Sequence, residues 1–148
     1  MSLLERLKSA QKDAMKAKDK LSLGAIRAVL AAVKQREIDE QITIDDAVVT
    51  AVLVKQVKQR RESLSQYNDA GRDDLAQKEA SEIEVLETFL PKPLSESEII
   101  ALVESTITEL DAKGMQDMGK VMGAIKSKAE GRADIGKISA IIKQKLTA

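Results

Sequence analysis

Both prolines of the chain lie in one short segment, LPKPLS, at residues 90–95. Proline lacks the backbone N–H that a helix needs and biases the preceding residue toward extended geometry, so this segment interrupts any helix that reaches it. On both sides of it, apolar residues recur with helical spacing and never alternate for long. These patterns predict an all-α protein with a larger N-terminal helical domain at 1–90, a linker at 91–94 and a small three-helix domain at 95–148.

Polar caps and glycines mark where the expected helices begin and end. In the segment TIDD, Thr43 and Asp46 predict a capping box at the start of the third helix. Beyond the prolines, Ser95 is expected to cap the fifth helix and Gly114 to end it. The sixth helix is expected to cover residues 117–131, with Gly131 at its end.

The composition excludes most enzyme chemistries. The chain has no histidine and no cysteine, so it can form neither disulfides, the usual zinc sites, nor a Ser-His or Cys-His nucleophile. A phosphate-binding loop of the G-x-x-x-x-G-K-S/T type is also missing from the sequence. We therefore expect no catalytic residue, no metal site, no cofactor and no turnover by the isolated chain.

The N-terminal residues and the hydropathy bear on location. No apolar run approaches the ~18 residues of a membrane span, and the segment MSLLERLKSAQKDAMKAKDK lacks the apolar core of a signal peptide. A cytoplasmic protein without a membrane partner is the resulting expectation.

Charge is segregated along the chain although 24 basic and 24 acidic residues cancel. Residues 1–36 carry nine basic against three acidic residues, residues 62–90 two against eight, and residues 113–148 eight against three. One interpretation is that basic and acidic helices pair within the protein or are simply solvated. The other is that the C-terminal part presents a basic docking surface to an acidic partner such as RNA.

The segment KQRRESLSQY gathers Lys58, Arg60 and Arg61 within four residues, as a phosphate-binding cluster does. An acidic helix follows it, however. We favour a structural role in which Arg60 or Arg61 bridges to that helix across an antiparallel pair.

The expected sixth helix contains two glycines, which each cost roughly 0.5–1 kcal/mol relative to alanine inside a helix. Gly119, Gly123 and Ser127 form a stripe of small residues on the face away from the apolar residues. Such a stripe admits another backbone closely, and it suits a helix of the same protein or an external partner. The basic residues that could serve an external partner are Lys120, Lys126, Lys128, Arg132 and Lys137.

Four segments together resemble the YqeY proteins of the GatB/YqeY family, in the order found there and over essentially the whole chain. They are MSLLERLK, KQRRESLSQY, LPKPLSESEI and DMGKVMGAIKSKAEGRAD. The C-terminal part is similar to the tail domain of the GatB protein of the tRNA-dependent amidotransferase, which contacts tRNA in that enzyme. The resemblance implies an all-α fold with a larger N-terminal domain and a small C-terminal three-helix domain.

The resemblance also implies a function, that of a tRNA-binding or amidotransferase-associated accessory module. Its partners would be tRNA or a protein of the tRNA-aminoacylation machinery. The family label of carbon-nitrogen ligase with glutamine as amido-N-donor is best explained as inherited, because the amidotransferase's ATP-dependent and glutaminase portions have no counterpart here. The alternatives are a protein-protein interaction module without a nucleic-acid role and an enzyme that acts alone.

Overall fold

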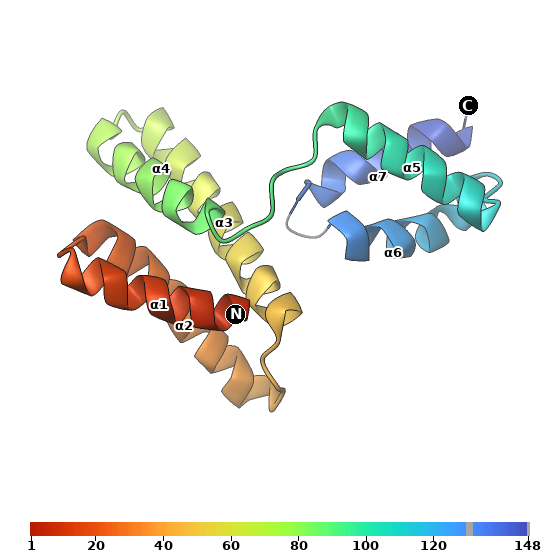
Figure 1. The fold of residues 1–148 in the computed structure, drawn as a ribbon. Coiled ribbons are helices and arrows are strands. Elements are labelled where there is room, and N and C mark those ends of the chain that lie inside the picture. Colours follow the sequence, from red (N-terminus) through yellow and green to blue (C-terminus); the bar gives the residue numbers. More distant parts are fainter. Residues whose placement is uncertain (130–131, 148) are drawn as a thin grey trace. The chain divides into compact units, whose positions relative to one another are not determined.

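A computed structural model describes residues 1–129 and 132–147 of the chain. All regular structure in these ranges is helical, which confirms the predicted all-α class. The chain divides into two compact units, Met1–Pro91 and Lys92–Ala148 (Figure 1). That each unit folds by itself stays a prediction.

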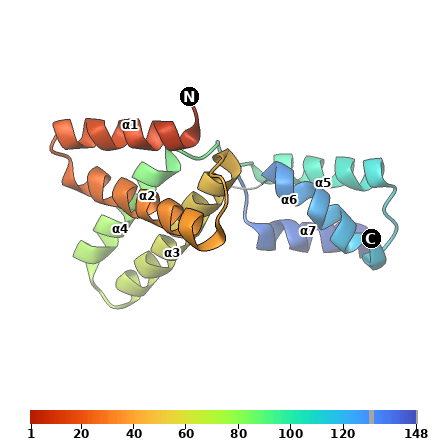
Figure 2. The same ribbon diagram turned by 90° about the horizontal axis from the view of Figure 1, so that it is seen from below.

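The N-terminal unit consists of four helices, which Figure 2 shows from below. They are α1 (Leu3–Lys16), α2 (Lys20–Glu40), α3 (Asp46–Asp69) and α4 (Asp73–Glu87). Helix α2 packs against the other three, and α3 and α4 form a long antiparallel pair. Fully buried leucines and valines at helical spacing, Leu7, Val29, Val49, Leu53 and Leu86, form the core of this unit.

The start of α3 differs from the predicted capping box of Thr43 and Asp46. The carboxylate of Asp45 caps this helix by accepting from the amide of Val48 at 2.9 Å. Asp46 instead accepts from the amide of Leu3, also at 2.9 Å, at the beginning of α1. The local prediction was wrong because a tertiary contact between two helix starts uses this side chain.

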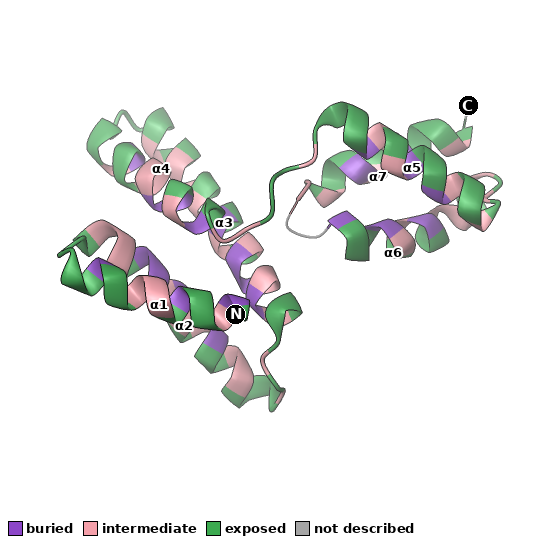
Figure 3. Ribbon diagram, in the orientation of Figure 1, coloured by how far each residue is buried: buried purple, intermediate pink, exposed green. Residues whose placement is uncertain are grey.

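The C-terminal unit is a three-helix bundle of α5 (Glu96–Leu110), α6 (Met118–Ala129) and α7 (Ile135–Thr147). Each of these helices packs against the other two. Their buried residues, drawn purple in Figure 3, face the inside of the bundle. The fully buried members are Val103, Val121, Ile125, Ala129, Ile138 and Ile142.

The ends of α5 were predicted with mixed success. Ser95 caps the helix as predicted, since its hydroxyl accepts from the amide of Glu98 at 3.2 Å. The predicted end at Gly114 is wrong, because α5 ends at Leu110 and Asp111 takes the left-handed conformation with φ of 50°. Gly114, with φ of 88°, precedes a short 3₁₀ helix, Met115–Asp117, that leads into α6. The predicted end of the sixth helix at Gly131 lies outside the described residues.

Residues that follow Pro91 are bound to the C-terminal unit. The amide of Leu94 donates to the carbonyl of Arg132 at 2.7 Å, and Nε of Arg132 donates to the carbonyl of Lys92 at 3.2 Å. The side chain of Leu94 packs against the core of the bundle. Arg132 thus anchors the segment that enters α5.

Among the described residues, no helix is both long enough and apolar enough to span a bilayer.

Candidate functional site

The small-residue stripe, Gly119, Gly123 and Ser127, lies on the exposed face of α6. The opposite face carries the buried residues Val121 and Ile125. Apart from its chain neighbours and the backbone of α6 itself, a Cβ added at either glycine would meet no described atom within 4 Å. The described residues of the C-terminal unit therefore leave the stripe open, and packing within this unit does not explain the two glycines.

Lys120 and Lys126 flank this stripe. Because successive residues of an α-helix are rotated by about 100°, the two lysines fall on either side of the line through Gly119 and Gly123. Both lysines are exposed, and neither forms an ion pair with any of the described residues. The two glycines thus expose helix backbone, and the two lysines border it with positive charge.

The other three basic residues proposed from the sequence are placed differently. Lys128 lies on the opposite side of the helix axis from Gly119, about 180° around it. Its ammonium is 3.8 Å from the carboxylate of Glu109 on α5. Arg132 is half-buried and anchors Lys92, as described above. Lys137 is exposed on the first turn of α7. The structure therefore groups Lys120 and Lys126 with the stripe, whereas Lys128 and Arg132 have internal contacts.

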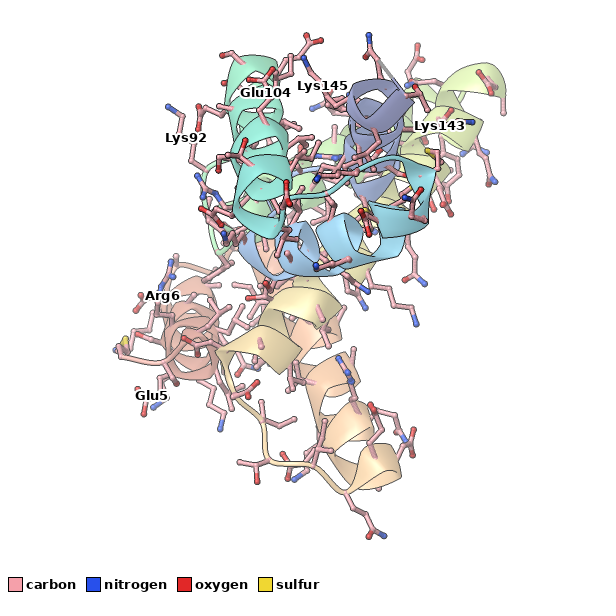
Figure 4. The ribbon with its side chains drawn as sticks, turned by 90° about the vertical axis from the view of Figure 1, so that its right-hand side faces the viewer. Glu5, Arg6, Lys92, Glu104, Lys143 and Lys145 are labelled. Carbon is pink, nitrogen blue, oxygen red and sulfur yellow. The ribbon has the colours of Figure 1, made fainter. Side chains whose placement is uncertain are left out.

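The bundle is electrically polarised in a way that the sequence analysis missed. All charged residues within α6 and α7 are lysines, whereas all charged residues within α5 are glutamates. Figure 4 shows Lys145 of α7 beside Glu104 of α5, where the two charged groups are 2.8 Å apart, and Lys143 on the other side of α7. Sorting charges by helix, rather than by sequence window, would have revealed this polarity.

The basic cluster in α3 has the structural role that the sequence favoured. The guanidinium of Arg60 contacts the carboxylate of Glu82 on α4 and lies 3.6 Å from that of Glu79. Its neighbour Arg61 pairs with Glu87 at 2.6 Å. The bridging of α3 to α4 is thus confirmed, and these two arginines are engaged within the unit.

No arrangement for catalysis was proposed from the sequence, and the described residues hold no cluster of three or more Asp and Glu that could bind a metal ion. The buried carboxylate of Glu82 is neutralised by Arg60 rather than directed into a cavity. The chemistry that this arrangement supports is the binding of an anion or of a polar backbone at α6.

Fold and site together define a small all-helical protein of two compact units with a basic, small-residue face in its C-terminal bundle. Residues 4–146 match the model of the family described as Yqey-like protein. The chain belongs to this family.

Three similar curated proteins carry the name "Altered inheritance of mitochondria protein 41, mitochondrial". The protein of Pyrenophora tritici-repentis is 32% identical over 127 residues, a match that covers 84% of this chain and 70% of that protein. The protein of Kluyveromyces lactis is 36% identical over 127 residues, covering 82% and 68%. That of Lachancea thermotolerans is 38% identical over 107 residues, covering 70% and 57%.

These relatives correct one prediction. The sequence predicts a cytoplasmic protein, but the similar proteins are named as mitochondrial, which conflicts with a plain cytoplasmic assignment. The prediction was wrong because it rested only on the absence of a membrane span and of a signal peptide, and such absences do not establish a location.

Proposed function

We propose that the chain is a tRNA-binding accessory module of tRNA-dependent amidotransfer and that its C-terminal bundle carries the binding face. The observation that carries this proposal is the placement of Lys120 and Lys126 on either side of an open glycine stripe. Ammonium groups that have no carboxylate partner within the described residues can exchange their counterions for phosphates, which is the main source of nucleic-acid affinity.

The glycines have a physical role in this proposal. A residue without a side chain lets a sugar-phosphate backbone approach the helix surface, as glycines do in other phosphate-binding segments. Ser127 continues the stripe, and its hydroxyl donates to the carbonyl of Ala124 at 3.2 Å, which leaves its oxygen able to accept. The stripe and the two lysines would then contact the same backbone.

The resemblance of the C-terminal segment to the tail domain of the amidotransferase's GatB protein supports tRNA as the nucleic acid. The amidotransferase's chemistry is not part of the proposal. We attribute the ligase label of the wider family to inheritance through the shared tail, because this chain offers no histidine or cysteine and no nucleotide loop for such a reaction.

A matched pair of double charge reversals tests the proposal. Lys120→Glu with Lys126→Glu is compared with Lys8→Glu with Lys12→Glu, which makes the same charge change on exposed lysines of α1. We expect fluorescence anisotropy with labelled tRNA at low salt to show a loss of about ten-fold or more for the α6 variant. Undetectable binding by the wild-type protein, or equal losses in both variants, would contradict the proposal.

A protein-protein interaction module without a nucleic-acid role is the second candidate, and the open stripe also favours it, since small residues at this spacing admit a partner helix. In this case the partner would bind in a salt-tolerant manner. A pull-down from cell extract with and without ribonuclease separates the candidates, because only an RNA-dependent complex is lost on treatment. Gly123→Leu should keep its melting temperature and lose the partner in both cases.

A further inference from the structure

A groove of about 340 Å³ runs between α1 and α2 in the N-terminal unit. Its floor is apolar and consists of Leu4, Leu30 and Val33. Val33 is 3% exposed and the two leucines are half-buried, so this floor is recessed below the surrounding side chains. The groove lies in the other unit from the small-residue stripe, and nothing in the proposed function uses it.

The rim of the groove is basic. Lys8 and Lys12 border it one helical turn apart on α1, and neither forms an ion pair with a described residue. Like charges at this spacing destabilise a helix slightly. On the α2 side, Lys34 is paired with Glu37 at 3.4 Å. The positive charge that remains for a partner therefore lies along α1.

We propose that this groove binds a short acidic, amphipathic helix of a partner protein. From Leu4 to Lys12 the groove follows about two turns of α1, or roughly 12 Å, a length that matches two apolar anchors one turn apart on the partner. Acidic residues on the partner's flank would meet Lys8 and Lys12.

The recessed floor distinguishes this occupant from two others. A membrane surface is flat at this scale and would contact the lysines without reaching the floor, whereas side chains projecting from a helix can enter it. A nucleic acid would likewise bind through the lysines and place its charged backbone over the apolar floor. Of these three occupants, an acidic helix with an apolar stripe fits both the apolar floor and the basic rim.

The test uses the full chain and fluorescent helical peptides of about four turns, ~15 residues, with leucines spaced one turn apart. One peptide carries glutamates on its polar face and its control carries lysines. We expect saturable binding of the acidic peptide, with an affinity at least about ten-fold above that of the basic peptide. Lys8→Glu with Lys12→Glu should lower the affinity for the acidic peptide about ten-fold or more, whereas Lys120→Glu with Lys126→Glu should leave it unchanged.

Three results would overturn the inference. They are the absence of saturable binding of the acidic peptide, equal binding of both peptides, and an affinity that does not respond to reversal of Lys8 and Lys12. Binding of phosphatidylserine vesicles that depends on these lysines, without peptide binding, would assign the face to a membrane instead.

Lys8→Gln with Lys12→Gln serves as a milder second variant, whose folding is checked by circular dichroism. It should lose part of the affinity for the acidic peptide. The tRNA assay measures binding that depends on the lysines of α6, and the peptide assay measures binding that depends on those of α1. The failure of one proposal is therefore distinguishable from the failure of the other.

Discussion

The α3–α4 pair and the α6 face use their basic residues in opposite ways. In the N-terminal unit, Arg60 and Arg61 extend toward the antiparallel helix α4 and form ion pairs with its glutamates. In the C-terminal unit, Lys120 and Lys126 point away from the bundle and have no ion pair within the described part of the chain. Similar clusters in the sequence therefore have different surroundings, and the deciding factor is which helix lies opposite.

Arg60 and Arg61 are neighbours in the sequence, but their side chains differ in exposure. The side chain of Arg60 is 15% exposed and that of Glu82 is 9% exposed, whereas Arg61 is 63% exposed. Removing one partner of a buried pair leaves an uncompensated charge in a medium that solvates it poorly, whereas an exposed pair is screened by water. The comparison can be sharpened by mutation in both units.

Arg60→Ala should have the largest effect on stability. It removes the nearest cation of the buried Glu82 and of the half-buried Glu79, and it leaves Glu82 with the exposed Lys78, whose ammonium is 3.9 Å away. We expect the free energy of unfolding to fall by about 3–5 kcal/mol in urea denaturation.

Two controls accompany this variant. Arg61→Ala, at the exposed pair, should cost less than about 1 kcal/mol. Arg60→Met with Glu82→Leu should recover part of the loss, because it removes both charges of the closer pair and fills the space, although Glu79 still lacks Arg60. A loss at Arg60 no larger than that at Arg61 would show that the burial of the pair does not govern its contribution.

Gly123→Ala should raise stability. The glycine lies inside a helix with no described atom near a new Cβ, so alanine is expected to add about 0.5–1 kcal/mol. Gly24→Ala in α2 is the matched control, because Gly24 is also helical and equally open. Both variants should be stabilised, but only Gly123→Ala should weaken binding to tRNA. A destabilised Gly123→Ala would indicate that the stripe is filled within the protein.

Asp19 should give the smallest effect, visible as a pH dependence. Hydrogen bonds from the hydroxyl and then the amide of Ser22 hold the pKa of this capping carboxyl below its ordinary value. A lowered pKa in the folded state adds stability at neutral pH that is lost as the pH falls below about 4. The difference in melting temperature between wild type and Asp19→Asn should therefore shrink on acidification. A difference that is constant from neutral pH to the acid range would contradict this assignment.

The sequence predicted those features that depend on local pattern. Apolar spacing and the proline pair predict helices on both sides of Pro91, and Ser95 is recognisable as a cap from its own neighbours. The pairing of the arginines with α4 was also accessible, since an acidic helix follows α3 closely in the chain.

Features that depend on distant residues could not be predicted in this way. The carboxylate of Asp46 accepts a hydrogen bond from the amide of Leu3, which is 43 residues earlier in the chain. Arg132 is engaged by Lys92, 40 residues earlier, and Lys128 by Glu109 on another helix. Spacing along the sequence contains no information about these partners. The sequence therefore grouped five basic residues, of which Lys120 and Lys126 flank the stripe, whereas Lys128 and Arg132 contact other parts of the unit.

The salt dependence of tRNA binding tests the central claim most directly, namely that the lysines of α6 are available for phosphates. The logarithm of the binding constant is measured against the logarithm of the salt concentration for wild type and for Lys120→Glu with Lys126→Glu. If both lysines contact phosphates, the slope of the variant should be less steep by about two, since each lost contact removes about one released counterion. Equal slopes for the two proteins would contradict the account, because they would show that neither lysine meets a phosphate.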